Sequence, residues 1–339
     1  MGAFLARLVD AALEASVVGS FSSIGLRVRR RLGGWEELPP GAGAGRVVLV
    51  TGATSGIGLA AAEHLAALGA TVRIVGRDEG RIARACESIE RAGSGPPVRG
   101  YRADLSSRAE VDRLVAEITE GEPRLDALVH NAGMLLPERL TSRDGHELHL
   151  ATMVLGPWRL TEGMLPLLAA GGGGRVVTVS SGGMYTQRLI VDDLESEGRY
   201  RGTVAYARAK RAQVVLTELW ARRHGDTGVV FHAMHPGWVD TPGVRRSLPA
   251  FHRILRPLLR TPEEGADTLV WLCLAAEPGR RSGLFWHDRR PRGVHRLPGT
   301  RESEAERRRL WERLESGDRP EASHREPPRG GPRSSPGRG

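Results

Sequence analysis

Residues 47 to 58 read Val-Val-Leu-Val-Thr-Gly-Ala-Thr-Ser-Gly-Ile-Gly, an apolar run of strand length that passes directly into a glycine-rich turn. Helical hydrophobic spacing follows over about 57 to 68, so the turn joins a strand to a helix. That context is typical of a dinucleotide-binding loop. Gly52 permits the tight turn, Gly56 lets the backbone approach a pyrophosphate, and Gly58 allows the helix to pack closely on the strand. An ordinary strand-to-helix turn is the alternative.

Strand-length apolar runs continue to alternate with helix-periodic segments as far as about residue 290. This alternation predicts repeated βαβ units around a parallel sheet. We expect seven strands, at Val47–Thr51, Thr71–Val75, Val98–Arg102, Ala127–His130, Arg175–Ser180, Val229–Met234 and Leu284–Trp286. The intervening helices are expected at roughly 57–68, 78–92, 106–119, 144–169, 204–224 and 262–276. The fold class is therefore α/β, a single Rossmann-like, doubly wound, seven-stranded parallel sheet with helices on both faces.

Four segments are expected along the chain. Residues 1–45 form an N-terminal amphipathic helix, within 1–26, and a linker at Gly41–Gly45; residues 46–290 form the catalytic domain; 291–317 form an extension with a possible helix; and 318–339 form a disordered basic tail. The N-terminal helix either docks against the main domain or contacts a membrane surface, and the sequence leaves both readings open.

Composition excludes several classes of protein. The 40% hydrophobic content of the 339 residues is too high for a chain disordered throughout. Two cysteines, Cys86 and Cys273, cannot build a disulfide framework or a four-cysteine metal site. A cytoplasmic location fits this usage, with membrane association left open. The net charge of +9 comes without interleaved aromatic residues, which make up 5%, so we expect no nucleic-acid partner.

The second predicted strand ends in Gly76-Arg77-Asp78. An acidic residue here would hold a ribose 2′-hydroxyl, whereas the Arg77 guanidinium suits a 2′-phosphate. We therefore expect NADP rather than NAD, with Asp78 as the residue that could still take the hydroxyl. Asp104 is placed to meet the adenine ring, or else to cap the helix that begins near Ser107.

Tyr206 and Lys210 stand four residues apart in a predicted helix, so they share one face. Lys210 is the only lysine in the sequence, among 49 lysine and arginine residues. A nearby ammonium lowers the pKa of a phenol by favouring the phenolate, which suits acid–base work. Ser181, at the carboxyl end of the fifth strand, is the candidate to bind a substrate oxygen, with Ser180 as its competitor.

These motifs together resemble the short-chain dehydrogenase/reductase family over about residues 46 to 290, with its T-G-x-x-x-G-x-G loop and Y-x-x-x-K pair. The resemblance implies hydride transfer between a nicotinamide and a carbonyl or alcohol carbon. It implies that Tyr206 is the general acid or base, that Lys210 lowers its pKa, and that Ser181 binds the substrate oxygen. The cofactor-binding residues would be Thr51, Gly52, Ser55, Gly56, Ile57, Gly58, Arg77, Asp104, Leu105, Asn131, Ala132, Gly133, Tyr206, Lys210, Pro236, Gly237 and Thr241.

Two departures from the family pattern stand out. Met153 occupies the place of an asparagine that joins a proton relay to the lysine, and either Thr152 or a water could take over, or turnover could be impaired. The interval of 25 residues between Ser181 and Tyr206 is also long. We expect this insertion, with Asp192, Asp193 and Tyr200, to form part of the substrate wall.

Histidines offer a weaker signal. His146 and His149, beside Glu147, lack metal-site spacing, so we expect surface histidines on a helix and no metal. His232 and His235 alternate on a strand and are expected to be structural. Trp238, Phe251, Leu255, Leu258 and Leu259 are expected either to cover the substrate as an apolar lid or to pack against the core.

The sequence thus predicts an NADP-preferring oxidoreductase acting on a small apolar carbonyl or alcohol. The alternative is a Rossmann-fold binding or regulatory protein that has lost turnover through Met153. A nucleotide-sugar epimerase is less favoured, because its glycine loop is spaced differently. Whether the chain forms homo-oligomers stays open.

Overall fold

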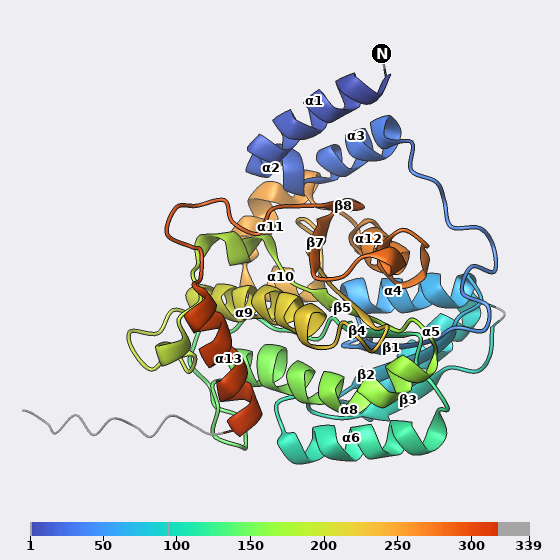
Figure 1. Ribbon diagram of the computed structural model, residues 1–339. Helices are drawn as coiled ribbons and strands as arrows, with labels where there is room; N and C mark the ends of the chain where they lie inside the picture. Colours follow the sequence, from blue (N-terminus) through green and yellow to red (C-terminus); the bar gives the residue numbers. More distant parts are fainter. Residues whose placement is uncertain (1, 94, 318–339) are drawn as a thin grey trace, which may run out of the picture.

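A mixed sheet of eight strands forms the centre of the computed structural model, which describes residues 2–93 and 95–317 (Figure 1). The strand order is β3-β2-β1-β4-β5-β6-β7-β8. The strands are β1 (Val47–Thr51), β2 (Thr71–Gly76), β3 (Arg99–Arg102), β4 (Ala127–His130), β5 (Arg175–Val179), β6 (Val230–Met234), β7 (Leu284–His287) and β8 (Arg290–Pro291).

The seven expected strands are all present and all parallel, which confirms the doubly wound α/β fold. The expected strand count was wrong by one, because β8 adds a short antiparallel edge to β7. Asp288 and Arg289, between the two strands, both have a φ of 52°, so the chain reverses there without glycine. A strand of two residues, one of them a proline, is too short to show the alternation of apolar and polar residues that indicates a strand, so the sequence could not predict it.

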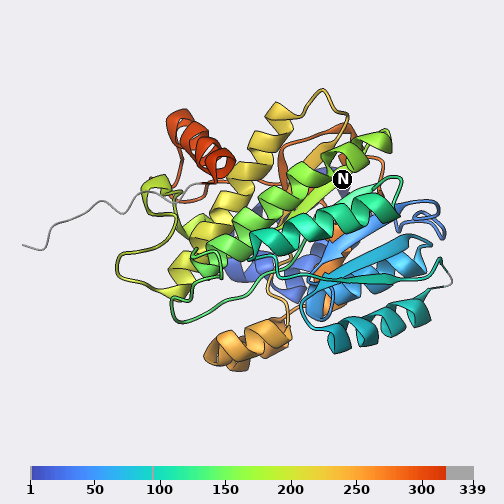
Figure 2. The same cartoon turned by 90° about the horizontal axis from the view of Figure 1, so that it is seen from below.

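Helices cover both faces of the sheet (Figures 1 and 2). One face carries α4 (Gly56–Ala67), α5 (Glu79–Ala92) and α12 (Pro262–Leu274), which pack on the sheet through an apolar core that includes Val50, Leu65 and Leu269. The other carries α6 (Arg108–Gly121), α8 (Gly156–Ala170) and α9 (Gly202–Arg223), over a core that includes Leu114, Met164 and Trp220. Because the strands are buried on both sides, the cofactor loop and the catalytic helix are held on one rigid frame.

The N-terminus forms three helices where one amphipathic helix over 1–26 was expected. They are α1 (Gly2–Ala15), α2 (Val17–Phe21) and α3 (Ser23–Gly33), which we call the N-terminal unit. Serines mark the breaks: Ser16 caps α2 by accepting a hydrogen bond from Gly19 N at 3.0 Å, and Ser22 stands between α2 and α3. Serine favours caps over helix interiors because its hydroxyl competes for backbone groups, and this explains the segmentation.

At the other end of the chain, α13 (Glu304–Ser316) packs across α9. Leu310, Trp311 and Leu314 of this helix are buried. The fully buried Arg211 of α9 pairs with Glu302, just before α13, at 2.5 Å. The expected disordered tail, 318–339, lies outside the described residues.

Candidate active site

A cavity of about 1170 Å³ opens at the carboxyl ends of the central strands. Of the predicted site residues, those that line it are Gly52, Ser55, Gly56, Ile57, Arg77, Asp104, Leu105, Asn131, Ala132, Gly133, Ser181, Tyr206, Lys210, Pro236, Gly237 and Thr241. The two others, Thr51 and Gly58, lie directly behind the lining and support it. Segments up to about 190 residues apart in sequence therefore meet in one place.

The glycine loop is held to β4 by Asn131 and Thr51. The Asn131 side-chain amide donates to the carbonyls of Thr51 at 3.0 Å and Gly52 at 3.1 Å. The Thr51 hydroxyl accepts from the backbone N–H groups of Asn131 and Ala132 and donates to Val129 O. A Cβ on Gly58 would lie 2.3 Å from the Asn131 amide nitrogen, so only glycine permits this clasp. The loop is therefore preorganised, with its backbone free to face a phosphate.

Two arginines lie where the cavity meets the first turn of α5. Arg77 is exposed and lines the cavity. Asp78 caps α5 by accepting from Arg81 N at 2.7 Å, which engages one of its carboxylate oxygens. Arg81, which the sequence reasoning missed, also lines the cavity and reaches Ser55 Oγ at 3.3 Å. Its position three residues after the capping aspartate was the available signal, since that places it in the first turn of the helix.

Asp104 closes a turn before α6 and does not cap that helix. Its Oδ1 accepts from the Ser106 backbone N–H at 2.9 Å and from the Ser106 hydroxyl at 2.8 Å. The helix begins at Arg108, and Ser107 is its N-cap residue. Asp104 therefore remains beside the cavity.

Ser181 and Ser180 point in different directions. The Ser180 hydroxyl donates to the Lys210 carbonyl at 2.9 Å, which ties β5 to α9. The Ser181 hydroxyl accepts from Gly183 N at 3.2 Å and hydrogen-bonds the Tyr206 phenol. Burial raises the pKa of Tyr206, whereas the bond with Ser181 works in the opposite direction. Ser181 is thus the serine placed next to the phenol.

Lys210 lies beneath Tyr206, with its Nζ 5.6 Å from the centre of the phenol ring. The ammonium donates to Val179 O at 2.7 Å. Burial lowers the pKa of Lys210 to about 7, because removal from water penalises the charged form. Lys210 can therefore change protonation state near neutral pH.

The helix after β4 differs from the expected single helix over 144–169. It comprises α7 (Leu148–Leu150), a π-helical turn (Ala151–Leu155) and α8. Met153 stands in the π-helical turn, fully buried, and its carbonyl accepts from Gln213 Nε2 at 2.8 Å. The neighbouring Thr152 hydroxyl is buried beside the cavity and has no hydrogen-bond partner. Single π-turns occur frequently at functional sites, and the extra residue here re-aims the side chains of this turn.

The prediction that His146 and His149 are surface residues of a helix was wrong. His149 is fully buried, and its ring lies edge-on to Tyr206 with centroids 6.1 Å apart. Leu136 N donates to His149 Nε2 at 3.0 Å, so the proton is on Nδ1, which lies 2.7 Å from Glu147 Oε1. The Tyr200 hydroxyl donates to the same oxygen at 2.9 Å. The residues around the His149 ring, from Leu136 to Tyr206, are separated by up to 70 positions, so local spacing could not indicate this burial.

Because Glu147 is buried with these partners, its ionisation state is set by two opposing effects. Burial raises its pKa, but hydrogen bonds from His149 and from Leu150 N outweigh that effect and hold the pKa below its usual value. The carboxylate therefore stays ionised. It fixes the His149 ring, which in turn fixes Leu136 at the cavity wall.

The insertion between Ser181 and Tyr206 contributes less to the cavity than expected. Asp192 pairs with Arg309 of α13, Asp193 with Arg208 of α9 at 3.0 Å, and Tyr200 with Glu147. The insertion does form part of the cavity wall, through Gly183, Thr186 and Thr203, whereas Asp192, Asp193 and Tyr200 do not line the cavity. Charged and hydroxyl groups here find partners on neighbouring helices instead.

Part of the cavity wall is apolar. It includes Leu135, Leu136, Trp238, Leu248 and Phe251. Trp238 and Phe251 meet edge to face with centroids 5.4 Å apart. Phe251 belongs to α11 (Pro249–Leu255), which follows α10 (Pro242–Ser247). Two of the five lid candidates thus cover the cavity.

The remaining lid candidates and the strand histidines lie elsewhere. Leu255, Leu258 and Leu259 do not line the cavity. His232 accepts from Trp286 Nε1 at 3.0 Å within the core, and His235 accepts from Gly237 N at 3.0 Å. Within the described ranges, no three histidine, cysteine or acidic side chains are grouped as a metal site would require.

Comparisons with known proteins agree with this geometry. The family model for short chain dehydrogenases matches residues 46–250. Dehydrogenase/reductase SDR family member 12 of Bos taurus is 44% identical over 274 residues, which are 80% of this chain and 86% of that protein. Retinol dehydrogenase 14 of Homo sapiens is 34% identical over 310 residues, 85% of this chain and 90% of its own.

Solved structures show the same likeness. One is a Beutenbergia cavernae protein assigned as an NAD(P)-dependent gluconate 5-dehydrogenase, with bound NADP at low occupancy. It superposes with a TM-score of 0.61 at 27% identity and covers 74% of this chain and 97% of its own. The chain therefore belongs to the short-chain dehydrogenase/reductase family, and it is an NAD(P)-dependent oxidoreductase of CH–OH and C=O groups.

Proposed function

We propose that the chain uses NADP(H) in preference to NAD(H) and acts on an apolar carbonyl or alcohol. The observation that carries the cofactor preference is the pair of arginines, Arg77 and Arg81, at the adenosine end of the cavity. Two guanidinium groups suit a dianionic 2′-phosphate, and the N-terminus of α5 adds a favourable dipole. Asp78 is engaged in capping this helix, which reduces its capacity to hold a 2′-hydroxyl.

The cavity fits a dinucleotide in its shape and chemistry. The preorganised glycine loop and the N-terminus of α4 would hold the pyrophosphate, Asp104 would meet the adenine, and Thr241 the nicotinamide end. A Cβ on Gly56 would lie 3.3 Å from the Thr241 methyl, so the glycine loop approaches Thr241 closely. The bound cofactor would supply or accept the hydride.

The protein's own groups would carry the proton. Tyr206 would give a proton to the carbonyl oxygen in reduction and take one from the alcohol in oxidation. Lys210 would stabilise the phenolate, and the Ser181 hydroxyl would hydrogen-bond the substrate oxygen. The side chains of Leu136, Trp238 and Phe251 favour an apolar substrate body.

The first experiment is a titration of the purified protein with NADPH and with NADH, followed by nicotinamide fluorescence. Arg77→Ala should weaken NADPH binding by about tenfold or more while NADH binding stays unchanged, because a charge-assisted contact to phosphate is lost. Arg84→Ala is the matched control, since it removes the same charge from the adjacent helix α5 at a position that does not line the cavity. Equal loss for both nucleotides would contradict the 2′-phosphate assignment.

A catalytically impaired binding protein is the second candidate, and Met153 is the observation that favours it. The thioether cannot relay a proton, and the Met153 carbonyl already accepts a hydrogen bond from the Gln213 side chain. NADPH consumption over a panel of carbonyl compounds separates the two candidates. Tight NADPH binding with no turnover on any member would support the binding protein.

We also propose that the N-terminal unit contacts a membrane surface while it stays docked on the main domain. Its exposed apolar side chains are Leu8, Val17, Val18, Ile24 and Leu32, and the exposed Arg7, Arg27, Arg30 and Arg31 lie in the same unit. No helix in the described part of the chain has the length and apolar character needed to cross a bilayer. Flotation with vesicles of anionic phospholipid should carry the full chain upward, and Val17→Ser/Val18→Ser should reduce this. Equal flotation of both proteins would contradict the contact.

A further inference from the structure

We infer that the N-terminal unit is part of the catalytic centre, and that Phe21 is a positioning residue for the loops that carry Ser181 and Gly237. The inference rests on the proposed function, since it concerns the same site. Phe21 belongs to α2, outside the 46–250 range of the family model. It does not line the cavity, so it would act through the two loops.

Phe21 touches the catalytic loop after β5. A Cβ on Gly182 would lie 2.5 Å from Phe21 Cε2, closer than any real Cβ contact, so the ring lies directly against the Gly182 backbone. Gly182 follows Ser181, the predicted ligand of the substrate oxygen. The ring therefore limits how far this loop can withdraw from the cavity.

Phe21 also holds the loop after β6. Its carbonyl accepts from Trp238 N at 2.8 Å, and its ring packs edge-on to Trp238 with centroids 6.0 Å apart. The ring lies edge-on to His235 as well, at 4.4 Å. Gly237 has a φ of 80°, and a Cβ there would lie 2.7 Å from the Phe21 carbonyl oxygen. One residue thus contacts the loops on both sides of the nicotinamide end of the cavity.

Arg260 holds the backbone on both sides of Phe21. Its guanidinium donates to Ser20 O at 3.0 Å and Ser22 O at 3.2 Å, the carbonyls on either side of Phe21, and to Pro236 O at 3.0 Å. Asp288 balances the charge with contacts of 2.6 and 2.9 Å. Both side chains are about 1% exposed. The N-terminal unit and the Gly237 loop are therefore joined by a buried charged group.

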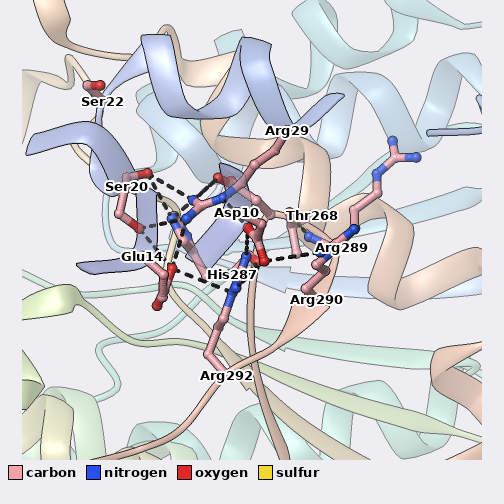
Figure 3. A network of polar contacts seen from close by, with 12 residues as sticks. Asp10, Glu14, Ser20, Ser22, Arg29, Thr268, His287, Arg289, Arg290 and Arg292 are labelled. Carbon is pink, nitrogen blue, oxygen red and sulfur yellow. Dashed lines mark hydrogen bonds and ion pairs between the residues drawn. The ribbon is translucent and has the colours of Figure 1, made fainter. Parts of the chain in front are cut away.

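Arg29 adds a second clamp, from α3 (Figure 3). It donates to Asp10 and Glu14 of α1, each at 2.8 Å, and to Asp288 at 2.7 Å. Figure 3 shows this guanidinium surrounded by α1, by Ser20 and by the β7–β8 turn. Fully partnered buried charges fix one geometry because any shift leaves a charge unpaired. These contacts fix the position of Phe21, so Phe21 can position the loops that carry Ser181 and Gly237.

The test compares the full chain with Phe21→Ala, Phe21→Leu and Leu297→Ala. Phe21→Ala should lower kcat by about tenfold or more, since small misplacements of catalytic groups can cost up to about a hundredfold. The NADPH Kd should stay within about threefold, because Phe21 does not contact the glycine loop or Arg77. Phe21→Leu should recover most of kcat. Leu297→Ala, which shortens an apolar side chain that is 51% exposed and outside the cavity lining, should leave kcat unchanged.

A double-mutant cycle separates positioning from general destabilisation. Gly182→Ala should lower kcat in the wild-type background, where its methyl group meets the Phe21 ring. In the Phe21→Ala background the methyl group enters the vacated space, so the second substitution should cost less. Additive losses in kcat, or a folded Phe21→Ala enzyme with kcat within about twofold of wild type, would overturn the inference. If Phe21→Ala does not fold, Phe21→Leu takes its place in the cycle.

Failure of the proposed function would look different. Wild-type protein that binds NADPH but reduces no carbonyl would contradict the oxidoreductase proposal alone. The inference is then decided by energy transfer from tryptophan to bound NADPH, because Trp238 borders the cavity. Phe21→Ala should change this transfer and Leu297→Ala should not; an unchanged transfer in Phe21→Ala would overturn the inference.

Discussion

Tyr206 and Lys210 show how two side chains one helical turn apart acquire their properties from burial. Neither the phenol nor the ammonium would titrate near neutrality in water. In the cavity, burial raises the pKa of Tyr206 and lowers that of Lys210 to about 7. Both shifts disfavour the charged form of the group in the free enzyme, because burial removes each group from water.

Tyr206→Phe tests the assigned acid–base role. Loss of the phenol hydroxyl should lower kcat by about 10²- to 10⁴-fold while the NADPH Kd changes little, because the ring is retained. Nicotinamide absorbance and fluorescence measure the two quantities. Tyr185→Phe is the matched control, since the Tyr185 hydroxyl donates to Gly293 O at 2.9 Å away from the cavity lining. Retained turnover in Tyr206→Phe would refute the role.

The lowered pKa of Lys210 predicts a pH dependence of stability in the absence of cofactor. Between about pH 7, its folded value, and its ordinary value of 10.5, the unfolded chain binds this proton and the folded chain does not. Unfolding then takes up a proton, so this group makes the free energy of unfolding rise with pH, by at most about 1.4 kcal/mol per pH unit. Urea unfolding at two pH values in this window measures the slope. Lys210→Met should show a smaller slope, and equal slopes would contradict the shift.

At the scale of elements, the helix after β4 has the greatest effect on the chemistry. Its π-helical turn buries Met153 against Gly133, where a Gly133 Cβ would lie 3.2 Å from the methionine sulfur and 3.6 Å from Lys210 Nζ. The turn therefore brings residue 153 to the lysine, although its side chain cannot hydrogen-bond. Just before the turn, Glu147 and His149 brace the cavity wall at Leu136.

Met153→Asn should raise kcat if a missing relay limits turnover, because the amide can hydrogen-bond near Lys210. Met153→Leu is the control for volume and should leave kcat close to wild type. Steady-state kinetics at several pH values report both the rate and any shift in the profile. An unchanged kcat in Met153→Asn would show that another group, such as the Thr152 hydroxyl, carries the proton.

For the whole molecule, the N-terminal unit and α13 are integral parts of the fold. The N-terminal unit covers the β7–β8 edge through Arg29, and α13 covers α9 through Arg211 and Glu302. Both arginines are buried, and each forms an ion pair with a buried acidic partner. The segments outside the family model thus contribute buried charge as well as apolar contact, and the N-terminal one reaches the active-site loops.

Arg29→Met should lower the free energy of unfolding by about 3 kcal/mol, because Asp10, Glu14 and Asp288 each lose one of their cationic partners in a buried cluster. Arg30→Met is the matched control, since Arg30 pairs with Glu37 at the surface, and such pairs contribute about 0–1 kcal/mol. Urea unfolding monitored by circular dichroism compares the two variants. Equal losses in both would mean that the buried cluster does not stabilise the docked N-terminal unit.

Much of the fold followed from local pattern. The strand–glycine loop–helix sequence at 47–58 and the regular alternation of elements sufficed for the parallel sheet, because each depends on residues within about one element of each other. The same holds for the Tyr206–Lys210 pair, whose spacing alone places both groups on one face. These are properties of short range, and a single sequence contains them.

What the tertiary structure decided depends on residues far apart in sequence. Arg260 meets Ser20 across 240 positions, and Arg29 meets Asp288 across 259. The burial of His149, the hydrogen bond from the Ser180 hydroxyl to the Lys210 carbonyl and the division of the N-terminus into three helices likewise follow from such contacts. No local periodicity encodes which distant group satisfies a buried charge or covers a ring, because that is settled only when the whole sheet and its helices pack together.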